Sequence, residues 1–242
     1  MNNTIAQEKV RQAVEVLRER DIDCWLTFTR ESDSSGEPAL DLILGANVTW
    51  NSAFIITQGG DSIAIVGDGD VQAVQTIGSF QEVIGYTQGI KRPLVDTLRR
   101  LNPRHIALNY SLDNVAADGL THGMYLLLCN LLEDTEFPHR FVSSDPIVTA
   151  VRGRKTPAEI EAIGKAIAVA EKILDEVSTH IKPGMSELDI FRWFHQRMEF
   201  YQVEPAWFAA SCPGVYCGPD SPTGHAFPEA DIILQGGQTL VV

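Results

Sequence analysis

A break in the pattern of secondary structure near residues 143–154 limits the fold of this chain more than any other feature. Before the break, apolar runs of strand length alternate with amphipathic runs of helical length, and after it two long helical patterns follow each other. The break carries Ser-Ser-Asp-Pro and then a basic cluster. A chain of 242 residues is long enough for one or two domains, each with its own core. The pattern therefore predicts two domains, residues 1–150 and 151–242.

The first domain is predicted to contain a mixed sheet with helices packed on its faces, in the α/β (α+β) class. Its clearest element is a hairpin, in which the apolar runs 53–57 and 63–66 flank Gln-Gly-Gly-Asp-Ser and are expected to pair as antiparallel neighbours. Residues 31–38, rich in Ser, Gly and acidic residues, are expected to form an exposed loop. Further strands are predicted at 24–28, 82–85 and 106–109, and helices at 6–20, 71–77, 92–101 and 120–132.

Two helices are predicted after the break. Thr156 suits the N-cap of the first, with Pro157 at the first helical position and Glu159 placed to close a capping box. Ser186 suits the N-cap of the second. The spacing of apolar residues predicts a buried stripe on the first helix at Ile160, Ile163, Ile167, Ala170, Leu174 and Val177, and a buried face on the second at Phe191, Phe194, Met198 and Tyr201.

The last part of the chain is predicted to contain a strand at 207–212, a loop bounded by Gly and Pro at 221–228, and a strand at 237–242. The loop carries His225. The final strand is apolar and has no turn residues after it, and an unpaired apolar edge is a rare end for a natural domain. We therefore expect the chain to be a piece of a longer protein.

Charge and cysteine content restrict the partners and the compartment. The chain has 19 Lys and Arg against 32 Asp and Glu, a formal net charge of −13, which disfavours binding to nucleic acid and to anionic membranes. No apolar run reaches the roughly 18 residues of a membrane span, and the first residues do not resemble a signal peptide. The cysteines show no disulfide-framework or zinc-finger spacing, so a soluble cytoplasmic protein is expected. Cys212 and Cys217 are either two buried thiols or half of a metal site.

Four motifs occur in an order and at a spacing that resemble the first half of the catalytic domain of the creatinase/aminopeptidase P/prolidase family, which has the pita-bread fold. The resemblance covers the whole chain, more strongly after Val151, and residues 1–150 resemble the smaller domain that precedes the catalytic domain in these proteins. The motifs are Arg154-Lys155-Thr156-Pro157-Ala158-Glu159-Ile160, Lys182-Pro183-Gly184-Met185-Ser186-Glu187, Gly224-His225-Ala226-Phe227-Pro228 and Gly237-Gln238-Thr239-Leu240-Val241-Val242.

The resemblance implies a metallopeptidase. Members of the family hold two divalent metal ions, Mn, Co or Zn, through two Asp, one His and two Glu, and the metals activate a water molecule for hydrolysis. The first ligand would directly follow Val242, so no metal ligand, no cofactor and no activity are expected of these 242 residues alone.

The resemblance also implies roles for three residues. His225 matches the loop histidine that faces the substrate and stabilises the tetrahedral intermediate; on the residues alone, it is equally a surface-loop histidine. Trp207 and Phe208 either line a pocket for a prolyl or other apolar side chain or pack in the core.

The function implied is that of an Xaa-Pro aminopeptidase or dipeptidase, acting on peptides that contain proline and forming a homodimer. Two alternatives remain on the same fold: a non-catalytic binding module, as in histone-chaperone relatives, and a creatinase-like amidinohydrolase.

Overall fold

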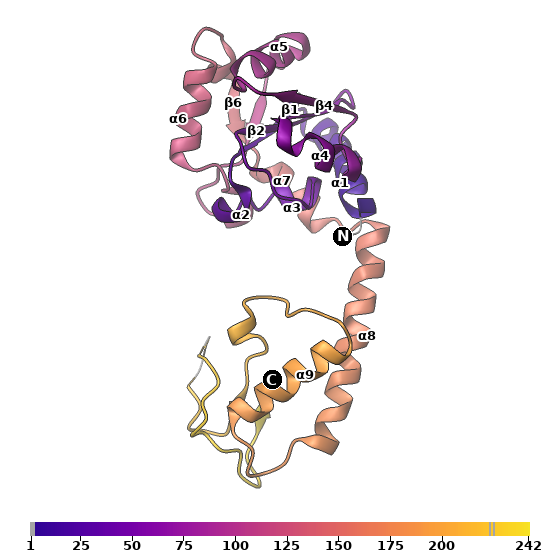
Figure 1. Ribbon diagram of the computed structural model, residues 1–242, viewed down its shortest axis with the longest axis vertical. Helices are drawn as coiled ribbons and strands as arrows, with labels where there is room; N and C mark the ends of the chain where they lie inside the picture. Colours follow the sequence, from indigo (N-terminus) through magenta and orange to yellow (C-terminus); the bar gives the residue numbers. More distant parts are fainter. Residues whose placement is uncertain (1–2, 223, 225) are drawn as a thin grey trace. The chain divides into compact units, whose positions relative to one another are not determined.

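The computed structural model describes residues 3–222, 224 and 226–242 (Figure 1). The chain divides into two compact units, Met1–Ile160 and Glu161–Val242. The assignment of residues 1–150 and 151–242 to an N-terminal domain and part of a catalytic domain stays a prediction.

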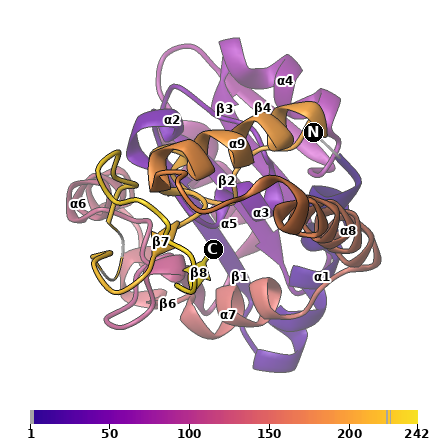
Figure 2. The same ribbon diagram turned by 90° about the horizontal axis from the view of Figure 1, so that it is seen from below.

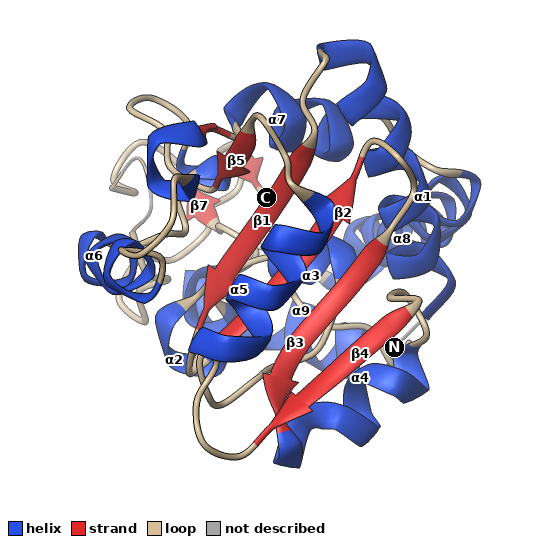
Figure 3. Cartoon of the chain, turned by 90° about the horizontal axis from the view of Figure 1, so that it is seen from above, coloured by secondary structure: helices blue, strands red, loops and turns tan. Residues whose placement is uncertain are grey.

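The first unit is built on a six-stranded mixed sheet with the order β4-β3-β2-β1-β5-β6. Figure 3 shows β1 to β4 of this sheet side by side. β2 pairs antiparallel with both β1 and β3, and the remaining neighbours are parallel. The predicted hairpin is confirmed, because Ala53 lies opposite Ile65 in its ladder. The strands are β1 (Cys24–Thr29), β2 (Ser52–Thr57), β3 (Ser62–Gly67), β4 (Glu82–Tyr86), β5 (Ile106–Leu108) and β6 (Phe141–Ser143). The predicted fold class is therefore confirmed, and β6 is a strand that the sequence did not indicate.

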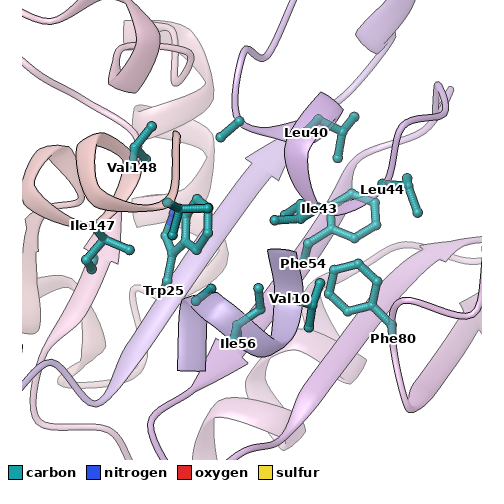
Figure 4. Close-up of a cluster of buried hydrophobic side chains, with 14 of the residues drawn as sticks. Val10, Trp25, Leu40, Ile43, Leu44, Phe54, Ile56, Phe80, Ile147 and Val148 are labelled. Atoms are coloured by element: carbon teal, nitrogen blue, oxygen red, sulfur yellow. The ribbon is translucent and has the colours of Figure 1, made fainter. Parts of the chain in front are cut away.

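Alternate residues of these strands belong to two separate apolar clusters, one on each face of the sheet. Trp25 and Phe54 pack with α1, α3, α4 and α7 on one face, where the rings of Phe54 and Phe80 lie 5.3 Å apart (Figure 4). Leu26 and Ile55 pack with α5 and α6 on the other face. The helices are α1 (Asn3–Arg20), α3 (Leu40–Ile43), α4 (Val71–Ile77), α5 (Lys91–Leu101), α6 (His122–Leu131) and α7 (Asp145–Gly153). Because every central strand is covered on both faces, all residues of β1, β2 and β3 are buried.

The segment 31–38 was expected to be an exposed loop, and this was wrong in part. It contains a short helix, α2 (Ser32–Ser35), and both Ser32 and Glu37 are buried. The Glu37 carboxyl accepts hydrogen bonds from the Ala39 N–H at 3.0 Å and the Asn109 carboxamide at 3.0 Å. Asn109 directly follows β5, so this acidic side chain is drawn into the polar interior at the end of the sheet.

A buried lysine connects α1 to the residues around the start of α8 (Pro157–His180). The side chain of Lys9 is fully buried, and its ammonium donates to the carbonyls of Val151 at 2.5 Å and Arg154 at 2.9 Å. The start of α8 has the predicted capping box, since the Thr156 N–H donates to Glu159 Oε2 at 2.7 Å and the Glu159 N–H to Thr156 Oγ1 at 3.4 Å.

The predicted buried stripe of α8 is mostly exposed, and that prediction was wrong. The helix packs instead through Val169, Ile173 and Val177, which contact the cluster formed with α9 (Glu187–Phe200). Of the predicted stripe only Val177 belongs to this cluster. An amphipathic pattern is buried only where a partner covers it, and among the described residues α9 covers the neighbouring side. The exposed fractions are 61% for Ile160, 43% for Ile163, 52% for Ile167 and 52% for Leu174.

The second unit is organised around α9 (Figure 2). Ser186 caps it as predicted, in a capping box in which the Asp189 N–H donates to Ser186 Oγ at 3.1 Å. Of the predicted apolar face, Phe194 is buried, and the other three side chains are partly buried against the same cluster, which Ile190 and Trp193 complete.

The predicted strand at 207–212 is absent, since this part of the chain forms a turn and a short 3₁₀ helix at Ala209–Ser211. The Trp207 indole N–H donates to the Ser211 carbonyl at 3.1 Å, which closes the turn locally. The predicted final strand is shortened to β8 (Leu240–Val241), which pairs antiparallel with β7 (Tyr216–Cys217).

Candidate functional site

Two of the three predicted site residues, Trp207 and Phe208, lie on the chain between α9 and β7. Trp207 and Phe208 are on the turn before the 3₁₀ helix, and their exposed fractions are 56% and 69%, so they do not pack in the core of the unit. His225 lies outside the described residues. The structure around the predicted site is therefore described through the described residues of the segment 217–229 and the side chain that binds them.

The side chain that holds this segment is Glu187, the first residue of α9. Its exposed fraction is 1%, although it is an acidic side chain at a surface helix end. The first turn of a helix has unsatisfied N–H groups and a positive dipole end, which favour a carboxylate there. The capping box of Ser186 and Asp189 satisfies the helix itself, so both oxygens of Glu187 remain available to other parts of the chain.

Both oxygens of the Glu187 carboxylate accept hydrogen bonds from residues beyond α9. Oε1 accepts from the Cys217 N–H at 2.9 Å and from the Ser221 hydroxyl. Oε2 accepts from the Glu229 N–H at 3.2 Å. A buried carboxylate with this set of donors is well satisfied, and hydrogen bonds to a charged acceptor are stronger than those between neutral groups.

A backbone ladder places the chain after Glu229 along the start of α9. The Leu188 N–H donates to the Glu229 carbonyl at 3.2 Å, and the Glu187 N–H to the Ile232 carbonyl at 3.0 Å. The Leu234 N–H donates to the Met185 carbonyl at 2.9 Å. These main-chain hydrogen bonds hold residues 229–234 against the residues at the start of α9, next to the Glu187 carboxylate.

The two cysteines near the segment are buried free thiols, as one of the two sequence interpretations has it. Cys212 is 4% exposed and its carbonyl lies 2.8 Å from His195 Nε2, while Cys217 is 1% exposed. Burial, with a smaller contribution from the nearby Glu187 charge, raises the pKa of the Cys217 thiol to about 11. Such a thiol is protonated near neutral pH.

Residues 3–222, 224 and 226–242 contain no group of three or more His, Cys, Asp or Glu side chains that could hold a metal ion. Among the residues that the structure describes, no donor set fits the pair of divalent ions that the family resemblance implies. The helices of the same described residues include none long and apolar enough to cross a membrane.

An apolar hollow of about 360 Å³ lies in the second unit, between α8, α9 and the chain after α9. Its lining includes Ile167, Ile173, Met198, Pro205 and Cys212. Neither Trp207 nor Phe208 lines it, so the structure does not bring the predicted aromatic residues into this hollow.

No protein-family model and no curated protein matches the sequence. Solved structures do match. An X-Pro aminopeptidase from Thermotoga maritima has a TM-score of 0.61 and 18% identity, covering 96% of this chain and 59% of its own. An Xaa-Pro dipeptidase from Bacillus anthracis has a TM-score of 0.63 and 17% identity, covering 97% and 59%. A prolidase from Pyrococcus horikoshii has a TM-score of 0.63 and 18% identity, covering 96% and 59%.

The chain shares the fold of Xaa-Pro peptidases. The resemblance inferred from the four sequence motifs is thereby confirmed for the fold. The chain spans about 59% of the length of each of these three structures.

Within this Xaa-Pro peptidase fold, sequence reasoning missed Glu187. An acidic residue directly after a Ser cap is typical of any helix N-terminus, and the sequence interpretation went no further than that. The donors to Glu187 are two main-chain N–H groups and one serine hydroxyl, and no pattern in the sequence marks them. Their distance from Glu187 along the chain hides that relation.

Proposed function

We propose that the protein to which this chain belongs hydrolyses peptides next to proline, as an Xaa-Pro aminopeptidase or dipeptidase. The observation that carries the proposal is the match of nearly the whole chain to three peptidases of this description. Because the chain spans about 59% of their length, the activity is proposed for the whole protein and not for these residues alone. Residues 1–150 are then its N-terminal domain, and residues 151–242 the first part of its catalytic domain.

In this proposal, His225 donates a hydrogen bond to the oxygen that becomes negative as the peptide carbonyl is attacked. Preorganised donors at such an oxygen are a major source of rate enhancement in hydrolases. The support is the match of residues 224–228 to the family motif; His225 itself lies outside the described residues, and the described residues on either side of it, Ser221 and Glu229, are bonded to the Glu187 carboxylate.

Trp207 and Phe208 are proposed to contact the apolar part of the substrate. The Trp207 N–H is used by the Ser211 carbonyl, so what Trp207 offers to a ligand is its ring face. Ring faces of this kind suit a pyrrolidine ring, which has no N–H of its own to satisfy within a peptide. The large exposed fractions of both side chains support a contact with a ligand over a role in packing.

The pair of Mn, Co or Zn ions belongs to the proposal for the whole protein. Since the described donor sets of this chain do not fit such a pair, its ligands are assigned to the part of the peptidase length that the chain does not span. The homodimer and the cytoplasmic location are also proposed for the whole protein, and they too come from the family resemblance.

The test is a hydrolysis assay of the full-length protein with each of the three metals. Matched peptides that differ only in Pro against Ala after the first residue report specificity, and creatine tests the amidinohydrolase alternative. Release of the first residue from the Pro peptides, with little release from the Ala peptides, is expected. Turnover of creatine, or peptide binding without hydrolysis under every metal, contradicts the proposal; the second result fits a non-catalytic binding module.

A further inference from the structure

A cavity in the first unit combines two tyrosine rings with an acidic side chain. Its volume is about 460 Å³, within the range of small-molecule pockets, and it lies between α6 and the loop that joins β5 to α6. The cavity is separate from Trp207 and Phe208, which do not line it. Its lining residues are Tyr110, Asp118, Leu120, His122 and Tyr125.

The loop that carries Tyr110 and Asp118 is closed at its base and bonded internally. At the base, the Leu120 N–H donates to the Asn109 carbonyl at 2.8 Å. Within the loop, the Ser111 N–H donates to Asp118 Oδ1 at 3.3 Å. The carboxyl of Asp118 is therefore tied to the residue that follows Tyr110, and the loop presents the two lining side chains together.

The second tyrosine is held by α6. Thr121 caps this helix, since the Met124 N–H donates to Thr121 Oγ1 at 3.3 Å, and Tyr125 lies in the first turn. The Tyr125 ring meets the Phe141 ring edge-on, with the centroids 6.2 Å apart. A hydrogen bond with the Cys129 thiol raises the pKa of the Tyr125 hydroxyl, which therefore stays neutral. The helix thus contributes a fixed and uncharged aromatic ring to the cavity.

The charge next to the cavity is negative. Asp118 is an exposed acidic side chain, and the buried carboxyl of Glu37 lies behind Gly119, because a Cβ placed on Gly119 would overlap it. Burial raises the pKa of Glu37 to about 7, so at pH 8 most of this carboxyl is charged. The whole chain has a formal net charge of −13, and this field attracts cations. His122 opposes it only when the imidazole is protonated.

We propose that this cavity binds a small free organic cation of the substituted-ammonium class, with the rings of Tyr110 and Tyr125 against its alkyl groups and Asp118 as its counter-ion. Aromatic rings attract a cation electrostatically, and tyrosine rings together with a carboxylate suit a quaternary ammonium group. Asp118 repels an anion and contributes little to the binding of an uncharged ligand. The site is independent of the proposed peptide hydrolysis.

The test compares choline with 3,3-dimethylbutan-1-ol, which has the same shape and no charge. Ligand-observed NMR titrations of the full-length protein at pH 8 and low ionic strength give the two affinities. Choline is expected to bind with a Kd on the order of 1 mM, and the uncharged isostere about tenfold more weakly. Added salt is expected to weaken the binding of choline and to leave that of the isostere unchanged.

Four variants locate the site. Asp118→Asn removes the charge and keeps an oxygen that can accept from the Ser111 N–H, and it is expected to raise the Kd of choline about fivefold. Tyr110→Leu removes a ring and is expected to raise the Kd by a similar factor, whereas Tyr110→Phe keeps the ring and should stay within about twofold of the wild type. The matched control is Asp113→Asn, which removes a charge from the same loop at an exposed position that does not line the cavity.

Three results would overturn the inference. The first is equal affinity for choline and its uncharged isostere, and the second is no saturation by choline at concentrations about tenfold above the expected Kd. The third is an equal loss of affinity in Asp113→Asn and Asp118→Asn, which would mean that choline responds to the general field of the chain and not to the cavity. Melting temperatures of all the variants show whether each is folded, and Tyr110→Phe with normal affinity shows that the loop itself is intact.

Discussion

The ammonium of Lys9 lies 2.7 Å from Oε2 of Glu159, with no exposed surface on the lysine side chain and 15% on the glutamate. The same ammonium donates to the carbonyls of Val151 and Arg154. A buried charge is tolerated only when it is paired and hydrogen-bonded, and here one lysine satisfies the end of α7 and the start of α8 together.

Replacing Lys9 by Met is expected to destabilise the first unit by about 3 kcal/mol, since the change leaves a partly buried carboxylate and two carbonyls without their donor. Urea unfolding followed by circular dichroism measures the effect. The control is Lys165→Met, which breaks the exposed pair with Glu161 and is expected to have no measurable effect. Equal midpoints for Lys9→Met and the wild type would show that the buried pair does not stabilise the unit.

Stability is expected to fall between about pH 4.5 and pH 7 because of Glu37. Burial raises the pKa of its carboxyl from 4.5 to about 7, although the Ala39 N–H and Asn109 act in the opposite direction. Oε2 has no hydrogen-bond partner among the described residues, so it is the oxygen on which a proton is best placed. In this interval the folded state binds more protons than the unfolded state, and the free energy of unfolding therefore decreases as the pH rises.

The variant Glu37→Gln is expected to remove this pH dependence. At pH 8 it should be more stable than the wild type, by about 3 kcal/mol at most, and at pH 4 the two should be similar. Urea midpoints from pH 4 to pH 8 measure the difference, with Glu15→Gln on the exposed face of α1 as the control. Parallel curves for the wild type and Glu37→Gln would contradict the assignment.

The cysteines are expected to differ in reactivity. Burial raises the pKa of Cys24 to about 12 and that of Cys217 to about 11, so at pH 8 only about 0.1% of a thiol like Cys217 is ionised. Cys129, which is only partly buried, should be alkylated first, and the three buried thiols only after unfolding. Mass spectrometry after a timed iodoacetamide reaction gives the order, and early labelling of Cys212 or Cys217 would contradict their burial.

Trp207→Ala in the full-length protein is expected to raise KM for an Xaa-Pro peptide about tenfold with kcat nearly unchanged, the pattern for loss of an apolar contact made equally in the ground state and the transition state. Phe208→Ala should behave similarly. Leu112→Ala, at a fully exposed position in the first unit, is the control. Unchanged KM in both aromatic variants would remove them from the site.

Sequence patterns predicted the central strands because those strands are apolar runs of strand length bounded by turn residues. β6 was missed because Phe141-Val142-Ser143 is too short to show a period, and α7 because Pro146, at its first turn, was interpreted only as a break. The capping box of Thr156 and the N-cap at Ser186 were predicted, since each depends on residues within one helical turn. A sequence pattern of a few residues therefore predicts an element well when neighbouring residues alone form that element, as in a helix cap or a hairpin turn.

The failed predictions of burial and of the strand at 207–212 share a cause, which is the dependence of burial and strand pairing on distant partners. The spacing of Ile160 and Ile163 is that of a buried stripe, yet the covered side of α8 is the one that contains Ile173. Trp207 and Phe208 suit a strand by composition, but no neighbouring strand pairs with them. Glu187 is buried because of donors from another part of the chain, and no periodicity in the sequence reports such a relation.

The position of β1 in the sheet has a consequence for synthesis on the ribosome. Its pairing with β2 joins neighbouring parts of the chain, and the β2–β3 hairpin is more local still. On its other edge β1 pairs with β5, which is translated much later, and β5 then pairs with β6. Until β5 and β6 have left the exit tunnel, the edge of β1, which is an interior strand of the finished sheet, is therefore exposed in the nascent polypeptide, and unpaired strand edges of this kind are prone to aggregation.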